Sequence, residues 1–330
     1  MLFLQAASLW YSHDVAGKEQ LLRCVDVTEG KGLELGPLHR PLLSKDEAKI
    51  YYVDHMSTQD LRKKYKGHPF SVKEIVQVDY VLQNNSLKQT VKGKKFSYVV
   101  ASHVIEHIPD TVSWLKDVAS VLEDGGVLFL VIPDKRFTFD ILREVSRPAD
   151  VIGAYLDKHT RASSAVLYDF FSEVRKNIDS AYVWHHPYED YSKHTHNYSL
   201  KRSYDKCLEN LKPDSYVDSH CFVFTPQSFC VILKRLIQHD LLGYEVVYFE
   251  ETPQDQLEFY VGLRKSKNST RAKKLRSLPK LPQPVERREL EEEVERLRTD
   301  LHNMRASRSW KITKPIRVVV TGIKKLRRRA

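Results

Sequence analysis

The chain has 330 residues, of which 42% are hydrophobic and 10% aromatic, enough to bury a core and to exclude a largely disordered protein. No apolar run approaches the roughly 18 uncharged residues of a membrane-spanning helix, and four scattered cysteines without a CxxC pair argue against a disulfide framework or a zinc knuckle. The net charge of +10 is uneven, since residues 264–330 hold 22 Lys and Arg against 7 Asp and Glu, whereas the preceding residues are slightly acidic. The apolar segment 1–10 lacks a basic leader, so we expect no signal peptide, and the cysteine pattern favours a reducing cytoplasm.

Short apolar runs rich in β-branched and aromatic residues alternate with helix-like stretches along the first 264 residues. Several of these runs lack polar alternation, which is typical of strands buried on both faces of a largely parallel sheet. This pattern predicts an α/β fold with helices on both faces of the sheet. The predicted strands are 32–35, 50–54, 74–78, 96–101, 127–132, 244–249 and 258–263, of which the last two would form an antiparallel pair.

Helical spacing of apolar residues predicts a helix between Ile108 and Leu122 that ends at Asp124-Gly125-Gly126. Thr225-Pro226 predicts the start of a second helix that runs to about Asp240. The predicted organisation is a helical segment over 1–30, a cofactor-binding core over 31–136, an inserted cap on the substrate side over 137–221, the end of the core over 222–264, a linker over 265–284, a short coiled coil over 285–306 and a basic amphipathic tail over 307–330.

The C-terminal part combines a heptad pattern with a basic end. Its a/d positions are Leu290, Val294, Leu297, Leu301 and Met304, which span only about two heptads and predict a weak pairing surface. Trp310, the apolar run 318–320 and the terminal Lys and Arg residues suit an anionic membrane surface. We therefore expect peripheral contact with the inner face of a membrane, with a solvated tail and nucleic-acid contact as the weaker alternatives.

Acidic residues stand near the carboxyl ends of the first three predicted strands. They are Glu34, which is followed by Gly36, then Asp54 and Asp79. The carboxyl ends of parallel strands meet at one edge of the sheet, where open α/β folds bind ligands. A carboxylate on the second strand can accept both hydroxyls of a ribose, and one on the third can meet an adenine edge. A GxGxxG dinucleotide fingerprint is absent, because Leu38 occupies a later glycine position.

Four segments resemble class I S-adenosylmethionine-dependent methyltransferases. They are 32–37, 51–54, the string Ser-His-Val-Ile-Glu-His-Ile-Pro-Asp at 102–110 and the string Leu-Glu-Asp-Gly-Gly-Val-Leu at 122–128. The resemblance implies a Rossmann-like methyltransferase sheet, mostly parallel with an antiparallel last strand, and S-adenosyl-L-methionine as the cofactor. It also implies that the chain is an enzyme.

The resemblance assigns roles to individual residues. Glu34 and Gly36 would approach the methionine moiety, Asp54 would hold the ribose and Asp79 would read the adenine. Ser102 and His103, at the end of the fourth strand, would line the methyl-transfer centre.

Residues after the fifth predicted strand are candidates for binding the acceptor. Lys135 and Arg136 lie beside aromatic residues above the active-site edge and suit a hydroxyl-rich or phosphorylated acceptor. A hydroxyl acceptor must lose a proton, and imidazole is the natural base near neutral pH. We therefore predict that His103 is the catalytic base, with His107 or a histidine of the cap as the weaker alternative.

The predicted cap is rich in histidine and acid, and His185 and His186 are its predicted substrate-binding residues. The full set is His185, His186, Glu189, Asp190, His194 and His196, with Asp218 and His220 further on. A divalent ion is conceivable here, but the spacing matches no standard ligand signature. We expect a polar cap and no metal.

Residues 307–317, Ser-Arg-Ser-Trp-Lys-Ile-Thr-Lys-Pro-Ile-Arg, resemble a short string beyond the coiled coil of many bacterial surface-polysaccharide glycosyltransferases and their companion enzymes. Together the resemblances imply O-methylation of a sugar hydroxyl in surface polysaccharide biosynthesis, with a glycan acceptor and a glycosyltransferase partner at the coiled coil. Two alternatives stay open, an RNA or small-molecule methyltransferase of the same fold and a non-catalytic methyltransferase-like scaffold. No Asn-Pro-Pro-Tyr string follows the fourth strand, which disfavours nucleobase amino methylation.

Overall fold

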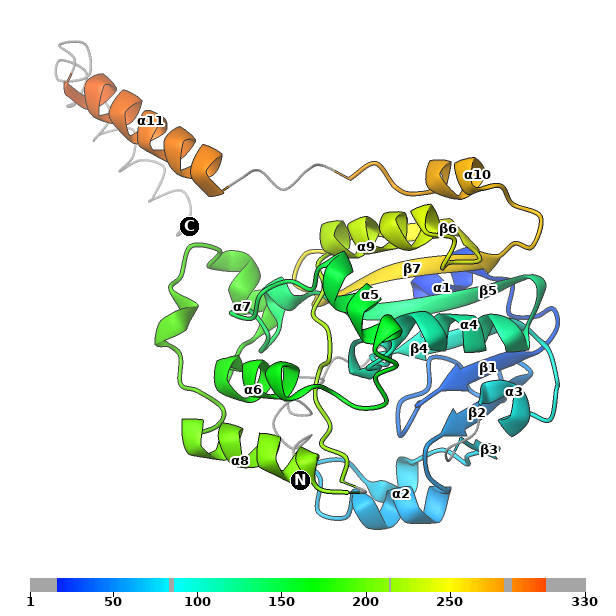
Figure 1. Cartoon of the computed structure of the whole chain (residues 1–330). Coiled ribbons are helices and arrows are strands. Elements are labelled where there is room, and N and C mark those ends of the chain that lie inside the picture. The colour runs from blue at the N-terminus through cyan, green and yellow to red at the C-terminus, as the bar shows by residue number, and fades with distance from the viewer. Residues whose placement is uncertain (1–16, 83–85, 214, 282–286, 307–330) are drawn as a thin grey trace, which may run out of the picture. The chain divides into compact units, whose positions relative to one another are not determined.

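A seven-stranded sheet forms the centre of the computed structural model (Figure 1), which describes residues 17–82, 86–213, 215–281 and 287–306. The strand order is β3-β2-β1-β4-β5-β7-β6. The strands are β1 (Gly32–Leu35), β2 (Ile50–Asp54), β3 (Tyr80–Val81), β4 (Phe96–Ser102), β5 (Leu122–Pro133), β6 (Tyr244–Glu250) and β7 (Glu258–Lys265).

The sheet is parallel from β3 to β5 and antiparallel at β5–β7 and β7–β6. The chain order reverses between β1 and β4, which lie side by side, so the loops after these two strands leave in opposite directions. Open α/β sheets bind ligands in the crevice at such a reversal. The predicted α/β class, the mostly parallel sheet and the antiparallel end are thereby confirmed.

Both faces of the sheet are buried, which explains the continuous apolar runs of its strands. In β5, Leu128 and Leu130 pack into the larger core cluster, whereas Phe129 and Val131 pack into a second cluster on the other face. The larger cluster receives residues from α3, α4, α5 and α9, and the second receives Leu21 of α1. A strand covered on both sides cannot alternate apolar with polar residues.

Some helices lie against this sheet, and those of the predicted cap lie to one side of it (Figure 1). Those of the first compact unit, which ends at Leu281, are α1 (Lys18–Cys24), α2 (Thr58–Lys64), α3 (Leu87–Thr90), α4 (Thr111–Val121), α5 (Pro148–Leu156), α6 (Ser164–Glu173), α7 (Ser180–His185), α8 (Leu200–Leu211), α9 (Pro226–Gln238) and α10 (Arg271–Arg276). Thr225 caps α9 by accepting from the Ser228 amide, as its sequence predicts. The predicted partly helical cap contains α5 to α8.

Three predicted boundaries are wrong. Residues 74–78 form no strand, and the third strand is the pair Tyr80–Val81, because Asp79 and its neighbours meet the edge of β2 only there. Helix α4 ends at Val121, and Asp124-Gly125-Gly126 lie within β5 rather than after the helix. The predicted linker 265–284 is partly folded, since Ser277 after α10 donates its hydroxyl group to the Lys274 carbonyl and accepts from the Val246 amide of β6.

The second unit, which starts at Pro282, contains α11 (Arg287–Ala306). The helix lies within the predicted coiled-coil segment 285–306, and the seam residues Val294, Leu297, Leu301 and Met304 are exposed. Pairing through this seam stays a prediction. The predicted tail 307–330 and residues 1–16 of the N-terminal segment lie outside the described residues, and no helix within the described part is long and apolar enough to cross a membrane.

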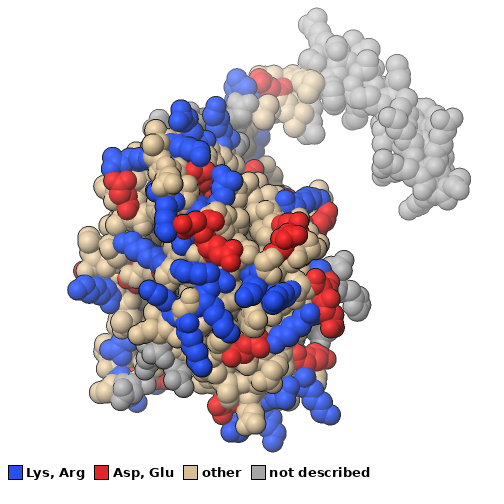
Figure 2. Space-filling view, turned by 90° about the vertical axis from the view of Figure 1, so that its right-hand side faces the viewer, with Lys and Arg blue, Asp and Glu red and all other residues tan. Residues whose placement is uncertain are grey.

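Exposed cations collect at the amino edge of the sheet, opposite the edge where the predicted site lies. Lys31, Lys49 and Lys95 precede β1, β2 and β4, and Lys267 follows the antiparallel β7. Figure 2 shows Lys and Arg gathered over the middle of one face with acidic side chains among them. The slightly acidic first part of the chain is therefore not uniform in charge.

Candidate active site

Glu34 is buried in β1, where it holds the loop that follows the strand. Its side chain is 1% exposed, and its Oε1 accepts from the Leu42 amide at 2.8 Å. Burial raises the pKa of this carboxyl group to about 8, although bonds from the backbone amides of Leu42 and Leu43 oppose the rise. Oε2 has no hydrogen-bond partner among the described residues. Glu34 therefore acts on the loop backbone.

Glu34 makes the stability of the fold depend on pH. The folded pKa of about 8 lies above the ordinary value of 4.5, so the folded state retains a proton that the unfolded state loses, and stability should fall as pH rises from about 4.5 to 8. Tyr52 and Tyr98, the phenols beside it, have raised pKa values and stay protonated in this range. Glu34→Gln should flatten this dependence, gaining on the order of a few kcal/mol relative to the parent protein at pH 8.5. Melting temperatures at pH 5.5, 7 and 8.5 would test this, and parallel curves for the two proteins would contradict it.

Asp54 ends β2 at the carboxyl edge of the sheet, as predicted. Its side chain is 5% exposed, and both of its described contacts are to Oδ1, from the His55 amide at 2.7 Å and from Nδ1 of the same residue at 2.6 Å. His55 in turn contacts Lys64 of α2. No partner for Oδ2 is found in the described part of the chain. The arrangement leaves a carboxylate oxygen at the strand end, which fits a ribose hydroxyl.

The turn after β1 also fits a nucleoside cofactor. Gly36 has a φ of +66°, which L side chains rarely adopt, and its amide donates to the Val53 carbonyl at 2.8 Å. Leu38 has a φ of +48°, and its side chain packs against the cluster of Leu61, Tyr65, Ile75 and Val78. The residue that replaces a usual glycine therefore has its side chain in this cluster around α2.

Asp79 lies opposite the middle of β2 and not at the carboxyl edge of the sheet, where it was predicted. It precedes β3, and its amide donates to the Tyr52 carbonyl while its Oδ2 accepts from the Tyr52 amide, both across from the middle of β2. Its Oδ1 accepts from Lys45 at 2.7 Å. The carboxylate thus completes the start of the β2–β3 ladder, and its predicted contact with adenine stays a prediction.

Ser102 ends β4, and His103 follows it in a left-handed conformation with a φ of +52°. Such a backbone in a residue other than glycine is strained and is often found at functional sites. The imidazole Nε2 lies 3.2 Å from Glu258 Oε1 at the start of β7, and Nδ1 lies 3.5 Å from Glu106 Oε1. The structure therefore places His103 between two carboxylates.

These carboxylates determine the charge of His103. Burial alone would lower the pKa of the imidazole, but the nearby carboxylates of Glu106 and Glu258 outweigh it and raise the pKa to about 9. An imidazolium has no lone pair to accept a proton. The groups beside it that offer lone pairs are the carboxyl oxygens of Glu106 and Glu258, and the catalytic role of His103 itself stays a prediction.

Two further imidazole–carboxylate pairs lie beside His103. His107 Nδ1 lies 3.0 Å from Asp218 Oδ1, and His220 Nδ1 lies 2.5 Å from Asp140 Oδ2. The two rings meet edge to face, with centroids 4.7 Å apart. Asp140 also accepts from Arg143 at 2.9 Å. The end of β4 and the returning segment of the cap thereby form one buried charged network.

Lys135 and Arg136 already have partners within the protein. Lys135 donates to the Ile141 carbonyl at 2.8 Å, and burial lowers its pKa although nearby carboxylates oppose this. The guanidinium of Arg136 makes a bidentate pair with Asp134, whose carboxylate is fully buried, while Arg136 itself is partly exposed. Their predicted contact with the acceptor stays a prediction.

His185 and His186 lie at the end of α7 and belong to a different group of contacts. His185 pairs with Asp255 at 3.0 Å, and the His186 ring stacks on Tyr182 at 3.9 Å. The described contacts join neither of them to His103. The structure brings neither His185 nor His186 to the end of β4, but it brings another histidine of the cap, His220, there.

The sequence singles out none of Glu106, Asp140 and Glu258 as site residues, and it places Asp218 only among the histidines and acidic residues of the cap. Glu106 and His107 lie in the Ser-His-Val-Ile-Glu-His string that carries the resemblance, so the sequence shows that they follow the fourth strand. It does not show which carboxylates pair with His107 and His220, because Asp218 is 111 residues from His107 in the chain.

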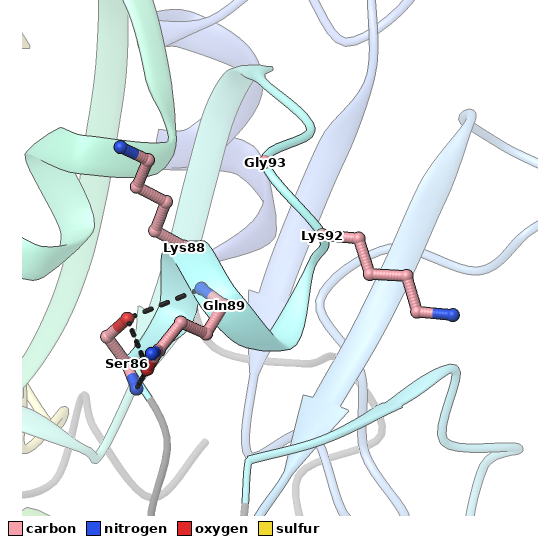
Figure 3. A pocket seen from close by; sticks show the side chains of 5 residues that line it. All are labelled: Ser86, Lys88, Gln89, Lys92 and Gly93. Carbon is pink, nitrogen blue, oxygen red and sulfur yellow. Dashed lines mark hydrogen bonds between the residues drawn. The ribbon is translucent and has the colours of Figure 1, made fainter.

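A surface hollow of about 610 Å³ lies over α3 and the turn that leads to β4 (Figure 3). Its lining residues are Ser86, Lys88, Gln89, Lys92 and Gly93, and Ser86 and Gln89 bond each other as the cap of α3. The hollow shares no residue with the network after β4. We therefore do not assign the active site to it.

The sequence matches a known protein family, and the fold is similar to several solved structures. Residues 15–236 match the family described as "Methyltransferase domain". No curated protein matches the chain. Similar solved structures include the CcbJ methyltransferase from Streptomyces caelestis (11% identity, TM-score 0.38, 76% of this chain and 95% of that chain) and a putative S-adenosylmethionine-dependent methyltransferase from Listeria monocytogenes (11%, 0.37, 76% and 99%).

A CurJ carbon methyltransferase is also similar, at 11% identity and a TM-score of 0.35. The alignment covers 75% of this chain and about half, 51%, of the CurJ chain. The family match covers more than half of the sequence and spans most of the sheet described above. The chain therefore belongs to the methyltransferase domain family and is an S-adenosylmethionine-dependent methyltransferase.

Proposed function

We propose that this enzyme transfers a methyl group to a hydroxyl oxygen of a polar acceptor, with a sugar as the acceptor class. The observation that carries the proposal is the network of imidazole–carboxylate pairs directly after β4, where His103, His107 and His220 each contact a carboxylate. A hydroxyl is a poor nucleophile until its proton leaves, so an oxygen acceptor needs such proton-accepting groups.

The residues of the chain divide the work between binding and proton transfer. When bound, S-adenosylmethionine supplies an electrophilic methyl group on a sulfonium. Asp54 would hold the ribose, and Gly36 would let the backbone approach the methionine part. The acceptor hydroxyl would lie beside His103 and give its proton to Glu258, which His103 holds in place at 3.2 Å. Most of the rate gain would come from positioning the two reactants in line.

We expect Asp54→Asn to weaken S-adenosylmethionine binding about tenfold or more, because a carboxylate that accepts ribose hydroxyls makes charge-assisted hydrogen bonds of about 1.5–3 kcal/mol. The substitution keeps an acceptor for the His55 amide, so the melting temperature of the unliganded protein should change little. Isothermal calorimetry would measure the affinity. Asp60→Asn, which changes an exposed carboxylate on α2, is the matched control and should bind normally. An unaltered affinity in Asp54→Asn would remove the ribose assignment.

The proposed biological setting is bacterial surface polysaccharide synthesis, with a glycosyltransferase as partner and a membrane surface as the location. The support for this setting is the resemblance of residues 307–317 and the basic composition of the chain end. Deletion of residues 285–330 should leave methyl transfer intact and abolish binding to vesicles that contain anionic lipid. Equal vesicle binding by the truncated and full chains, or a preference of the full chain for RNA at 0.15 M salt, would contradict it.

A radiolabelled methyl donor distinguishes the proposed function from its rivals. The full chain would be incubated with nucleotide-activated hexoses and oligosaccharides, with amine-bearing small molecules, and with RNA. Label on the sugars as a base-stable ether supports the proposal, whereas label on RNA or on an amine contradicts it. Calorimetry without any acceptor tests the scaffold alternative, since a scaffold of this kind would not bind the cofactor.

A further inference from the structure

One buried carboxylate and two imidazoles converge at the end of β4. Glu106, His107 and His220 each offer a ligand atom, and these atoms all lie within 4.8 Å of one another. No other group of His, Cys, Asp and Glu converges in this way within the described part of the chain. We propose that these three residues bind a divalent first-row transition metal ion, a site that the histidine spacing in the sequence did not predict.

Glu106 is a buried carboxylate that makes no hydrogen bond to its nearest cation, the His103 imidazolium. Its side chain is 1% exposed, and neither carboxylate oxygen has a hydrogen-bond donor among the described residues. Its ion-pair contacts are longer than hydrogen bonds, at 3.5 Å to His103 Nδ1 and 4.0 Å to His107 Nε2. A buried carboxylate without donors is costly, and a cation between Glu106 and the two imidazoles would satisfy it.

Both imidazoles are oriented as metal ligands usually are. His107 contacts Asp218 through Nδ1 at 3.0 Å, and His220 contacts Asp140 through Nδ1 at 2.5 Å. Metal-binding histidines commonly donate one ring N–H to a carboxylate, which fixes the ring and makes the other nitrogen the ligand. Here the same nitrogen of both rings contacts a carboxylate, and Nε2 of His107 is directed toward Glu106.

Backbone contacts fix the two segments that carry these ligands. The Glu106 carbonyl accepts from the amides of Cys221 and Phe222, at 2.6 Å and 3.1 Å. The Cys221 thiol donates to the His107 carbonyl at 3.3 Å, and the guanidinium of Arg143 donates to the His220 carbonyl at 3.1 Å. The three ligands are therefore held near one another before any ion binds.

The donor set indicates the class of metal. Two imidazole nitrogens and one carboxylate oxygen suit zinc, cobalt, iron or nickel, whereas Mg²⁺ and Ca²⁺ prefer oxygen ligands throughout. Ligand atoms bind such ions at about 2.0–2.2 Å, so small side-chain rotations would bring the three ligand atoms to that distance from a single ion. Three protein ligands leave a coordination position open. If the proposed O-methylation is correct, on which this one step rests, that position would take the acceptor hydroxyl.

Metal binding can be measured without any acceptor or methyl donor. The full chain would be stripped with a chelator and titrated with Co²⁺, whose visible absorption reports its ligands, followed by displacement with Zn²⁺. We expect one equivalent of Co²⁺ to bind and Zn²⁺ to displace it. Asp218→Asn, which loosens His107 without removing a ligand, should weaken binding about 10- to 100-fold, and Glu106→Gln should weaken it further.

His185→Ala is the matched control, since it removes an exposed histidine that also pairs with a carboxylate. It should bind Co²⁺ as the parent protein does. Absence of the Co²⁺ band in the parent protein, full binding by Glu106→Gln, or loss of binding in His185→Ala would each overturn the proposal. If Glu106→Gln does not fold, full binding by Asp218→Asn overturns it as well, because Asp218 is partly exposed and its loss should be tolerated. Metal binding together with methylation of nitrogen or carbon would contradict only the proposed O-methylation.

Discussion

Replacing Arg143 by alanine should lower the free energy of unfolding by about 3–5 kcal/mol, because it leaves a buried carboxylate without its cation. Arg143 is 3% exposed and donates to Asp140 at 2.9 Å, to Asp169 at 2.7 Å and to the His220 carbonyl at 3.1 Å. Without it, the hydrogen bond that remains to the Asp140 carboxylate among the described residues is the one with His220. Denaturant unfolding of the two proteins would measure the difference.

Arg147→Ala provides the control, since Arg147, the residue directly before α5, pairs with Asp150 through an exposed side chain. Such surface pairs contribute roughly 0–1 kcal/mol, so this variant should unfold almost as the parent protein does. Equal effects of the two substitutions would show that the network after β4 adds nothing to stability. The site residues would then not be held in place by this network.

Replacing His103 by alanine should lower kcat by roughly 10²–10⁴, because the proposed proton acceptor, Glu258, is then no longer held in place, and this is the usual range for loss of a positioned proton-transfer group. Without the imidazole, Glu258 loses its contact at 3.2 Å and Glu106 loses its nearest ion-pair partner. The affinity for S-adenosylmethionine should stay within a few-fold of the parent value, because Asp54 lies on another strand and is unchanged. Single-turnover kinetics with a labelled methyl donor would measure the chemical step.

His239→Ala is the control for this rate, as it changes an exposed histidine at the end of α9 that takes no part in the network. Its rate should match that of the parent protein. A full-rate His103→Ala would exclude His103 from the reaction. A loss confined to KM would instead assign it to acceptor binding.

The central strands could be predicted because each is covered on both faces. β1 and β2 have the predicted bounds, and β4 differs by one residue. β3 could not be predicted, since it has two residues and lies at the edge of the sheet, where β2 supplies a partner on one side alone. An apolar run at 74–78 instead packs toward α2, where Ile75 and Val78 join its cluster.

In the site, too, some residues could be predicted from the sequence and others could not. Asp54 could be placed from the sequence because the end of a predicted strand determines which edge its side chain lies near. The pairing of His107 with Asp218 could not, because it depends on how residues 218–222 return from the cap and bond to Glu106. The cap also packs into the core, where Leu167 and Phe171 of α6 join the larger cluster. Sequence periodicity contains no information about that return path.

Transfer of a labelled methyl group to a sugar would show directly whether the enzyme methylates sugar hydroxyls. The full chain would be given S-adenosylmethionine labelled in the methyl group and a mixture of nucleotide-activated hexoses and oligosaccharides, and the product would be examined by NMR. The account predicts a methyl ether on a sugar oxygen, and Asp54→Asn should reduce its formation at low donor concentration. A methyl group found on nitrogen or carbon, or no transfer to any sugar by a chain that binds the donor, would contradict it.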